Sequence, residues 1–140
     1  MIIVDTGIFV AANLPRDQHH KACLRFFLDP GDDLAVTDLA VAEVAFLLGR
    51  RTRGRRAPEA PFLRLIATGR VPSLAPTMTD YGRMADLVEE YADLPLGATD
   101  ASVVAIAERL GVTRIATVDR RDFGIVRPRH IGAFELVPAL

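Results

Sequence analysis

Cysteine is almost absent from this sequence: Cys23 is the only one among 140 residues. A single cysteine cannot form an intrachain disulfide, and it excludes a metal site built from thiolates. Long hydrophobic runs are also missing, because each is interrupted well short of the ~20 residues that span a bilayer. No basic segment precedes an apolar core at the N-terminus, as a signal peptide would require. These absences predict a soluble protein of the cytoplasm with no membrane partner.

Lysine is equally scarce, since Lys21 is the only one and the other sixteen basic residues are arginines. A GC-rich genome would produce that bias by itself, so the placement of the arginines is more informative than their number. Two basic clusters are present, one made of Arg50, Arg51, Arg53, Arg55 and Arg56, the other of Arg120, Arg121, Arg127, Arg129 and His130. With a net charge of −1, this predicts polarised surfaces and not a uniformly nucleic-acid-binding body.

Short apolar strands alternate with helical segments along the chain. The run Ile2-Ile3-Val4 has no polar alternation, which is typical of a strand buried on both faces of a parallel sheet. Similar strands are expected at 34–36, 115–118 and 134–137, with a proline-bounded edge strand at 72–76. Helices are expected near 6–13, 17–28, 39–50, 62–68, 79–91 and 101–110. This order predicts an α/β fold with a short, mainly parallel central sheet, in a single domain over residues 1–140.

Two of these strands are followed by an aspartate. Asp5 comes directly after the first strand, and Asp119 follows the strand 115–118. Ligands of open α/β sheets bind outside the carboxyl ends of the strands, so both carboxylates are candidates for a site. The structural alternative for Asp5 is an N-cap of the next helix, a position at which Asp is strongly preferred.

The helix expected at 39–50 carries a single acid among apolar residues. Residues 39–48 read Leu-Ala-Val-Ala-Glu-Val-Ala-Phe-Leu-Leu, which is apolar on every helical face except at Glu43. Such a helix is expected to be buried, and no lysine or arginine lies three or four positions from Glu43 to pair with it. A lone buried carboxylate is costly, so Glu43 is expected to be protonated, to face a polar cavity or to meet a cation. We favour a functional site over a structural role.

A fourth acid, Asp100, lies in the first turn of the helix at 101–110. It can cap that helix, where the helix dipole favours a negative charge, but Thr99 can do the same and leave Asp100 free. If the four carboxylates converge, they repel one another unless divalent cations lie between them. A ligand set made only of oxygen favours Mg²⁺ or Mn²⁺ over zinc. Such ions hold substrate phosphates, so the predicted chemistry is phosphodiester hydrolysis.

The same residues resemble those of the PIN-domain ribonucleases, specifically the VapC-type toxins of toxin–antitoxin pairs. The matching positions are Asp5-Thr6, Glu43 with Arg50 seven positions on, Thr99-Asp100-Ala101, and Thr117-Val118-Asp119 followed by Phe123. They are spread over nearly the whole chain. One departure is Gly7, where many relatives carry Ser or Asn; it calls into question a side-chain hydroxyl contact there, not the metal site.

The resemblance implies that Asp5, Glu43, Asp100 and Asp119 are catalytic, metal-binding acids that hold Mg²⁺, or alternatively Mn²⁺. It also implies an α/β/α sandwich, a homodimer, an RNA substrate and a VapB-like antitoxin whose tail lies in a groove and blocks the site. The implied function is a metal-dependent endoribonuclease toxin that cleaves cellular RNA. The alternative is a non-catalytic protein of the same fold that acts only by binding a partner.

Other families fit the residues less well. Asp5-Thr6-Gly7 is also the signature triplet of retropepsin-like proteases, but their fold is all-β, whereas this chain is mostly helical. A haloacid-dehalogenase-like phosphatase requires a second Asp at the position of Gly7. A phospho-receiver domain requires a lysine late in the chain, where this sequence has none.

Asp122 lies close to Asp119 but is expected to have a different role. It is separated from Asp119 by two arginines and is expected to begin a turn or short helix. There it would cap the turn or pair with an arginine, a surface role worth at most about 1 kcal/mol. Asp119 is instead expected at the edge of the sheet beside Asp5.

Overall fold

The computed structural model of the protein describes residues 1–51 and 57–140. The first basic cluster, at positions 50–56, therefore falls largely outside the described residues. The strands are β1 (Ile2–Val4), β2 (Leu34–Thr37), β3 (Ser73–Leu74), β4 (Arg114–Ala116) and β5 (Glu135–Val137). The helices are α1 (Thr6–Asn13), α2 (His20–Leu28), α3 (Asp38–Arg51), α4 (Glu59–Ala67), α5 (Met78–Glu90), α6 (Ala98–Leu110) and α7 (Arg120–Ile125). No helix in these two described ranges is long and apolar enough to cross a membrane.

The five strands form one sheet in the order β3-β2-β1-β4-β5, and every neighbouring pair is parallel. The expected α/β class is confirmed, and the sheet is parallel throughout. β3 lies at an edge, as its flanking prolines predict. β1 lies at the centre, where all three of its side chains are fully buried, which explains its unbroken apolar sequence.

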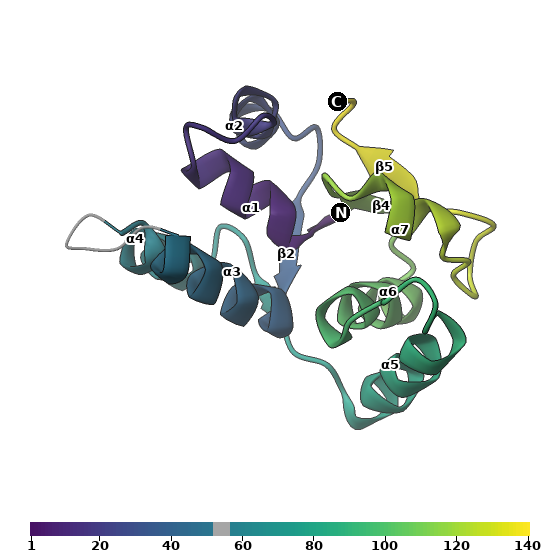
Figure 1. Ribbon diagram of the computed structural model, residues 1–140. Coiled ribbons are helices and arrows are strands. Elements are labelled where there is room, and N and C mark those ends of the chain that lie inside the picture. The colour runs from purple at the N-terminus through teal and green to yellow at the C-terminus, as the bar shows by residue number, and fades with distance from the viewer. Residues whose placement is uncertain (52–56) are drawn as a thin grey trace.

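Helices cover both faces of the sheet, which gives the expected α/β/α sandwich (Figure 1). One hydrophobic core joins Ile3 and Ile115 of the sheet to α5, α6 and α7. The other joins Ile2, Val4 and Ala116 to α1, α2, α3 and α4. The two sets alternate along β1 because successive strand residues point to opposite faces.

Only one side of α3 is buried. Ala40, Val44 and Leu48 are fully buried at a spacing of four residues, and they pack on the sheet and on α1. Outside this buried face, Glu43 is exposed, and Phe46 is 61% exposed. The expectation that Glu43 is buried is therefore wrong. The apolar composition of α3 predicts burial all round, but neighbouring elements cover only one of its faces.

Candidate active site

Asp5 is held rigidly at the carboxyl end of β1. Asp5 is only 5% exposed to solvent. Its backbone N–H donates a hydrogen bond to the carbonyl of Ala116 at 2.8 Å. Oδ1 accepts a hydrogen bond from the backbone N–H of Thr6 at 2.8 Å, so Asp5 also caps α1. Oδ2 accepts a hydrogen bond from the hydroxyl of Thr117 at 2.9 Å. The capping role and the site role proposed for Asp5 are thus compatible.

Thr117, not Asp119, is the neighbour of Asp5 across the sheet. β4 ends at Ala116, which pairs with Val4, so the next residues on the two strands are Thr117 and Asp5. Asp119 lies two residues further on and is exposed. The expected position of Asp119 beside Asp5 therefore needs correction, because the strand was predicted two residues too long.

Asp119 is connected to Asp5 through the buried hydroxyl of Thr117. The backbone N–H of Asp119 donates to Thr117 Oγ1 at 2.9 Å, while that hydroxyl donates to Asp5. Asp119 also caps α7, since its Oδ1 accepts a hydrogen bond from the N–H of Asp122 at 3.2 Å. The carboxylate of Asp119 consequently lies at the rim of the site.

Glu43 is brought to Asp5 by Thr6. The hydroxyl of Thr6 donates to Glu43 Oε2 at 2.8 Å, and the backbone N–H of Thr6 donates to Asp5. Thr6 is buried, so its contacts to Asp5 and Glu43 lie on the inner side of the site. Although Glu43 is exposed, it joins the group of acids that the sequence predicted.

Asp100 reaches the same region from the start of α6. It is the third residue of that helix, and its Oδ2 accepts a long hydrogen bond of 3.4 Å from the backbone N–H of Gly97. Asp100, and not Thr99, therefore makes the side-chain contact to the N-terminus of α6. A bond of this length is weak and leaves the carboxylate available to other partners.

A pair of hydroxyl groups fixes α3 and α6 relative to each other. Thr37 Oγ1 and Ser102 Oγ are 2.9 Å apart, and both side chains are fully buried. Thr37 Oγ1 also accepts the N–H of Ala40 at the start of α3, and Ser102 donates to the carbonyl of Thr99. These contacts join the helix that carries Glu43 to the helix that carries Asp100.

The acids lie within electrostatic reach of one another. Burial raises the pKa of Asp5 to about 7, with further contributions from the charges of Asp100 and Glu43. Burial likewise raises the pKa of Asp100 to about 6, with contributions from Glu43, Asp119 and Asp122. Burial and the neighbouring Asp119 raise the pKa of Asp122 as well. Each of these carboxylates is therefore destabilised in its charged form.

The chemistry of these acids suits a divalent cation. In the described part of the chain, no lysine or arginine forms an ion pair with Asp5, Glu43, Asp100 or Asp119. A cation would offset their repulsion, and their oxygen ligands suit Mg²⁺ or Mn²⁺. As the side chains lie, no three acidic, histidine or cysteine residues of residues 1–51 and 57–140 form a group that could hold an ion.

Gly7 leaves space for the neighbouring strand end. A Cβ atom at this position would lie 2.5 Å from Cγ2 of Val118 and 3.9 Å from Oδ2 of Asp5. Val118 thus occupies the volume that a side chain at position 7 would need. This explains the departure noted at Gly7 in the sequence.

Sequence reasoning did not assign roles to Thr6, Thr117 or Ser102, whereas Thr37 was a candidate cap of the helix that follows it and accepts the N–H of Ala40. The first two lie next to predicted acids or strand ends, and a hydroxyl at a parallel strand end is a natural donor to a neighbouring carboxylate. Ser102 gave no such signal, since it lies within an otherwise apolar helix.

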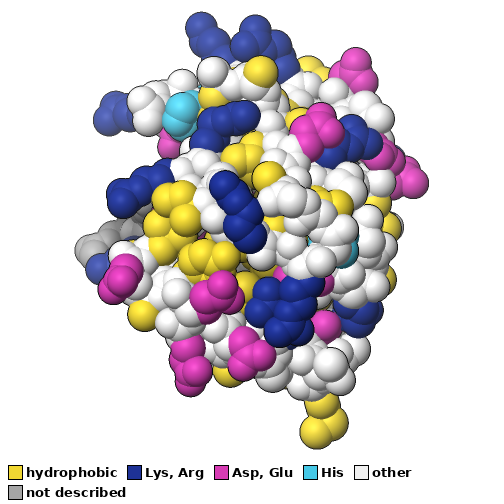
Figure 2. Space-filling model, turned by 90° about the vertical axis from the view of Figure 1, so that its right-hand side faces the viewer, with side chains coloured by type: hydrophobic (Ala, Val, Ile, Leu, Met, Phe, Trp, Pro, Cys, Tyr) yellow, Lys and Arg dark blue, Asp and Glu magenta, His cyan; other side chains and the backbone are white. Residues whose placement is uncertain are grey.

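The predicted basic cluster at 120–130 is divided among separate contacts: Arg120 donates to the carbonyls of Leu136 and Pro138, and Arg127 to those of Gly124 and Val126. On the face drawn in Figure 2, basic and acidic side chains are interspersed among hydrophobic ones.

Comparison with known proteins gives consistent matches over this chain. The family model described as "PIN domain" matches residues 2–127. Ribonuclease VapC26 of Mycobacterium tuberculosis (strain ATCC 25618 / H37Rv) is 30% identical over 137 residues, which cover 98% of this chain and 100% of that protein. The crystal structure of Mycobacterium tuberculosis VapC20, titled a sarcin-ricin loop cleaving toxin, superposes with a TM-score of 0.79 at 19% identity, over 87% of this chain and 92% of that one. FitAcB from Neisseria gonorrhoeae superposes with a TM-score of 0.63 at 20% identity, over 88% of this chain and 91% of that one.

Proposed function

Since the chain belongs to the PIN-domain family, we propose that it is a divalent-metal-dependent endoribonuclease and the toxin of a toxin–antitoxin pair. Its similarity to Ribonuclease VapC26 along the full length of both proteins supports the RNA-cleaving activity. The substrate is then cellular RNA, and the activity takes place in the cytoplasm. We propose that residues 1–140 act as one domain.

One observation carries the proposal: acids from four separate elements lie within electrostatic reach at the carboxyl edge of the sheet. Burial, with a further contribution from the charges of the other acids, raises the pKa of Asp5 to about 7 and that of Asp100 to about 6. Maintaining such a group costs stability in the absence of a cation, and groups of this kind are concentrated at functional sites. The edge is also the place where open parallel sheets bind their ligands.

Asp5, Glu43 and Asp100 would hold Mg²⁺, with Mn²⁺ as the alternative, and Asp119 would contribute from the rim. A bound ion of this kind supplies an activated water and stabilises the leaving oxygen of a phosphodiester. The threonines keep the ligand oxygens in place: Thr117 and Thr6 donate to the two oxygens of Asp5, and Thr6 also donates to Glu43. Because Asp5 is buried and accepts two hydrogen bonds, its carboxylate would be the most rigidly held of these ligands.

The antitoxin would bind beside Glu43. The exposed face of α3 carries Ala42 and Phe46, and the guanidinium of Arg50 lies 5.9 Å from the centre of the Phe46 ring. A protein partner on this face would cover Phe46, which is 61% exposed, together with the guanidinium beside it. A VapB-like segment that covers this face would also block access to Glu43.

We also propose a homodimer formed through α5. Its outer face exposes Met78, Tyr81 and Val88, and a depression of about 380 Å³ lies between Tyr81, Val88 and Leu39 of α3. Paired copies of this face would bury these side chains. Light scattering that gave a monomer mass at micromolar concentration would contradict the dimer.

The activity is tested with purified, antitoxin-free protein and total cellular RNA. Cleavage is expected with Mg²⁺ or Mn²⁺, and it should stop when EDTA is added and resume when the ion is restored. Asp100→Asn should abolish cleavage, whereas Asp93→Asn, a matched change at an exposed position before α6, should leave it unchanged. Cleavage that survives complete chelation would contradict the metal dependence. A folded protein that cleaves no RNA with either ion would favour the non-catalytic alternative.

A further inference from the structure

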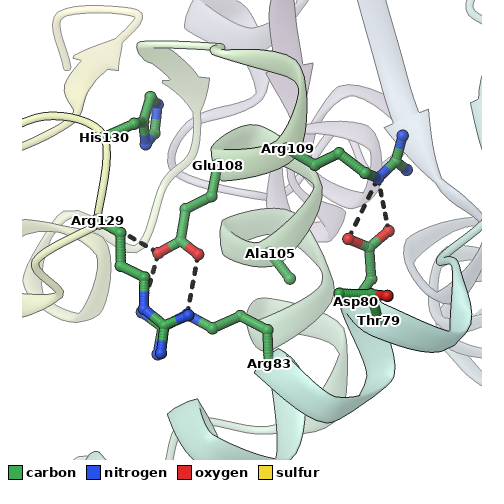
Figure 3. A pocket seen from close by; sticks show the side chains of 8 residues that line it. All are labelled: Thr79, Asp80, Arg83, Ala105, Glu108, Arg109, Arg129 and His130. Atoms are coloured by element: carbon green, nitrogen blue, oxygen red, sulfur yellow. Dashed lines mark hydrogen bonds and ion pairs between the residues drawn. The ribbon is translucent and has the colours of Figure 1, made fainter.

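A pocket of about 360 Å³ lies between α5, α6 and residues 129–130 (Figure 3). We call it the α5–α6 pocket. Its α6 residues, Ala105, Glu108 and Arg109, are at the opposite end of the helix from Asp100. Asp100 and Glu108 are eight positions apart, which corresponds to about 12 Å along the helix axis. The pocket is therefore separate from the group of acids at the edge of the sheet.

Two ion pairs between α5 and α6 form opposite walls of the pocket (Figure 3). On one side, Arg83 donates to Glu108 through Nε at 2.8 Å and Nη2 at 2.9 Å. On the other side, Arg109 donates through Nε to both oxygens of Asp80, at 2.9 and 3.2 Å. Ala105 lies between the two pairs, and its small side chain leaves the space open.

The carboxylates of these pairs also accept hydrogen bonds from the backbone. Glu108 Oε1 accepts the backbone N–H of Arg129 at 3.0 Å in addition to Arg83. Asp80 accepts the backbone N–H of Thr77 at 2.9 Å in the capping box of α5. Both acids are at least nine-tenths buried, with side chains 10% and 5% exposed. They therefore act as fixed supports for the arginines and have little capacity for a further ligand.

The arginines, in contrast, keep unused donors. A guanidinium carries five N–H groups, and Glu108 engages only Nε and Nη2 of Arg83. Among the described residues, no hydrogen bond engages Nη1 of Arg83. Arg109 and Arg129 are more open, with side chains 37% and 67% exposed. The lining thus offers guanidinium donors that are already oriented by ion pairs.

The guanidinium groups of the lining can bind an anion through their free donors, although the charges are balanced. Arg83 and Arg109 pair with Glu108 and Asp80, and Arg129 Nη2 lies 3.9 Å from Oδ2 of Asp86, which is outside the lining. Guanidinium groups on two opposed walls suit tetrahedral phosphoryl oxygens, which accept hydrogen bonds in several directions. The volume exceeds that of a phosphate group alone. We propose that the α5–α6 pocket binds the phosphoryl group of a phosphate monoester, either a small sugar phosphate or the phosphorylated end of an RNA.

The proposal is tested by calorimetric titration of the full chain in low salt with EDTA, so that no metal-dependent binding at the acids contributes. Ribose 5-phosphate is expected to bind saturably and to weaken as salt is added, while ribose should not bind. A short oligoribonucleotide with a 5′-phosphate, compared with the same oligonucleotide without it, identifies the source of the ligand. Tighter binding of the phosphorylated oligonucleotide than of ribose 5-phosphate would assign the pocket to RNA ends.

Substitutions in the pocket separate it from other basic surfaces. Arg109→Gln and Arg129→Gln should each weaken binding of ribose 5-phosphate at least tenfold, whereas Arg70→Gln, at an exposed position outside the pocket, should not. Because Arg129 is largely exposed, Arg129→Gln is expected to fold normally and to retain RNA cleavage, which keeps this test independent of the nuclease assay. Absence of saturable binding by both phosphorylated probes would overturn the proposal. Equal affinities in the wild type and both pocket variants would do so as well.

Discussion

The hydroxyl group of Thr117 occupies a central position among the single residues of the site. It is fully buried, it donates to Asp5 Oδ2 at 2.9 Å, and it accepts the N–H of Asp119 at 2.9 Å. The backbone N–H can only donate, so the proton of the threonine must point to Asp5. One hydroxyl thereby orients the buried carboxylate and positions the chain that leads to Asp119.

Replacing Thr117 by valine should weaken Mn²⁺ binding about tenfold or more, because a hydrogen bond to a charged group is worth about 1.5–3 kcal/mol. Asp5 would keep only the donor from Thr6 and would rotate more freely. Thr117→Ser restores the hydroxyl and should recover most of the affinity, while Thr113→Val, at an exposed position, should have no effect. Calorimetric Mn²⁺ titration measures all three. Unchanged affinity in a folded Thr117→Val variant would show that the hydroxyl has no positioning role.

At the scale of elements, α7 connects the rim of the site to the second core. Asp119 caps this six-residue helix through the N–H of Asp122, and Phe123 on the same helix is buried in the core of α5 and α6. The charge of Asp119 and its capping oxygen therefore serve different purposes. A substitution can separate them, since Asn caps helices about as well as Asp.

The Asp119→Asn variant should keep α7 intact while it loses the charge next to Asp100. We expect weaker Mn²⁺ binding and slower RNA cleavage, with a smaller loss than in Asp100→Asn. Asp122→Asn should change either property less, because the effect of Asp122 on the pKa of Asp100 ranks behind that of Asp119. Mn²⁺ titrations and cleavage rates of both variants give the order. A larger effect of Asp122→Asn would identify Asp122 as the acid that contributes from α7.

At the scale of the whole molecule, the group of acids ties stability to pH and to metal. The pKa of Asp5 is about 7 and that of Asp100 about 6 in the folded protein, compared with an ordinary value of 3.8. The folded state therefore retains protons that the unfolded state has released between about pH 4 and pH 7. Stability from these two groups is complete below about pH 4 and is lost as the pH rises to 7.

We expect the melting temperature of the metal-free protein to fall as the pH is raised from 4.5 to 7. In Asp5→Asn this fall should be smaller, and the variant should melt about 5 °C or more above the wild type at pH 7, since a stability change of 1 kcal/mol shifts Tm by several degrees. Added Mn²⁺ should raise the wild-type melting temperature most at pH 7, where the carboxylates have lost their protons. Differential scanning calorimetry in EDTA and in Mn²⁺ provides both measurements. Parallel pH profiles of the two proteins would contradict the coupling.

The sequence alone determined the class of the fold and indicated which acids to expect near one edge of the sheet. Ile2-Ile3-Val4 could be recognised as a central parallel strand because full burial on two faces leaves no polar position. Asp5 could be placed at the edge because it follows that strand. Asp100 could be placed at a helix start from the residues that surround it.

Only the tertiary structure decided how these residues meet. The composition of α3 cannot reveal which of its faces has a neighbour, so the exposure of Glu43 and Phe46 was not predictable. The end of β4 at Ala116 depends on its pairing with Val4 of β1, and that register places Thr117 beside Asp5 and Asp119 at the rim. The contact between Thr37 and Ser102 joins residues 65 positions apart. Burial, register and long-range contacts are properties of pairs of elements, and a local pattern carries information about only one element at a time.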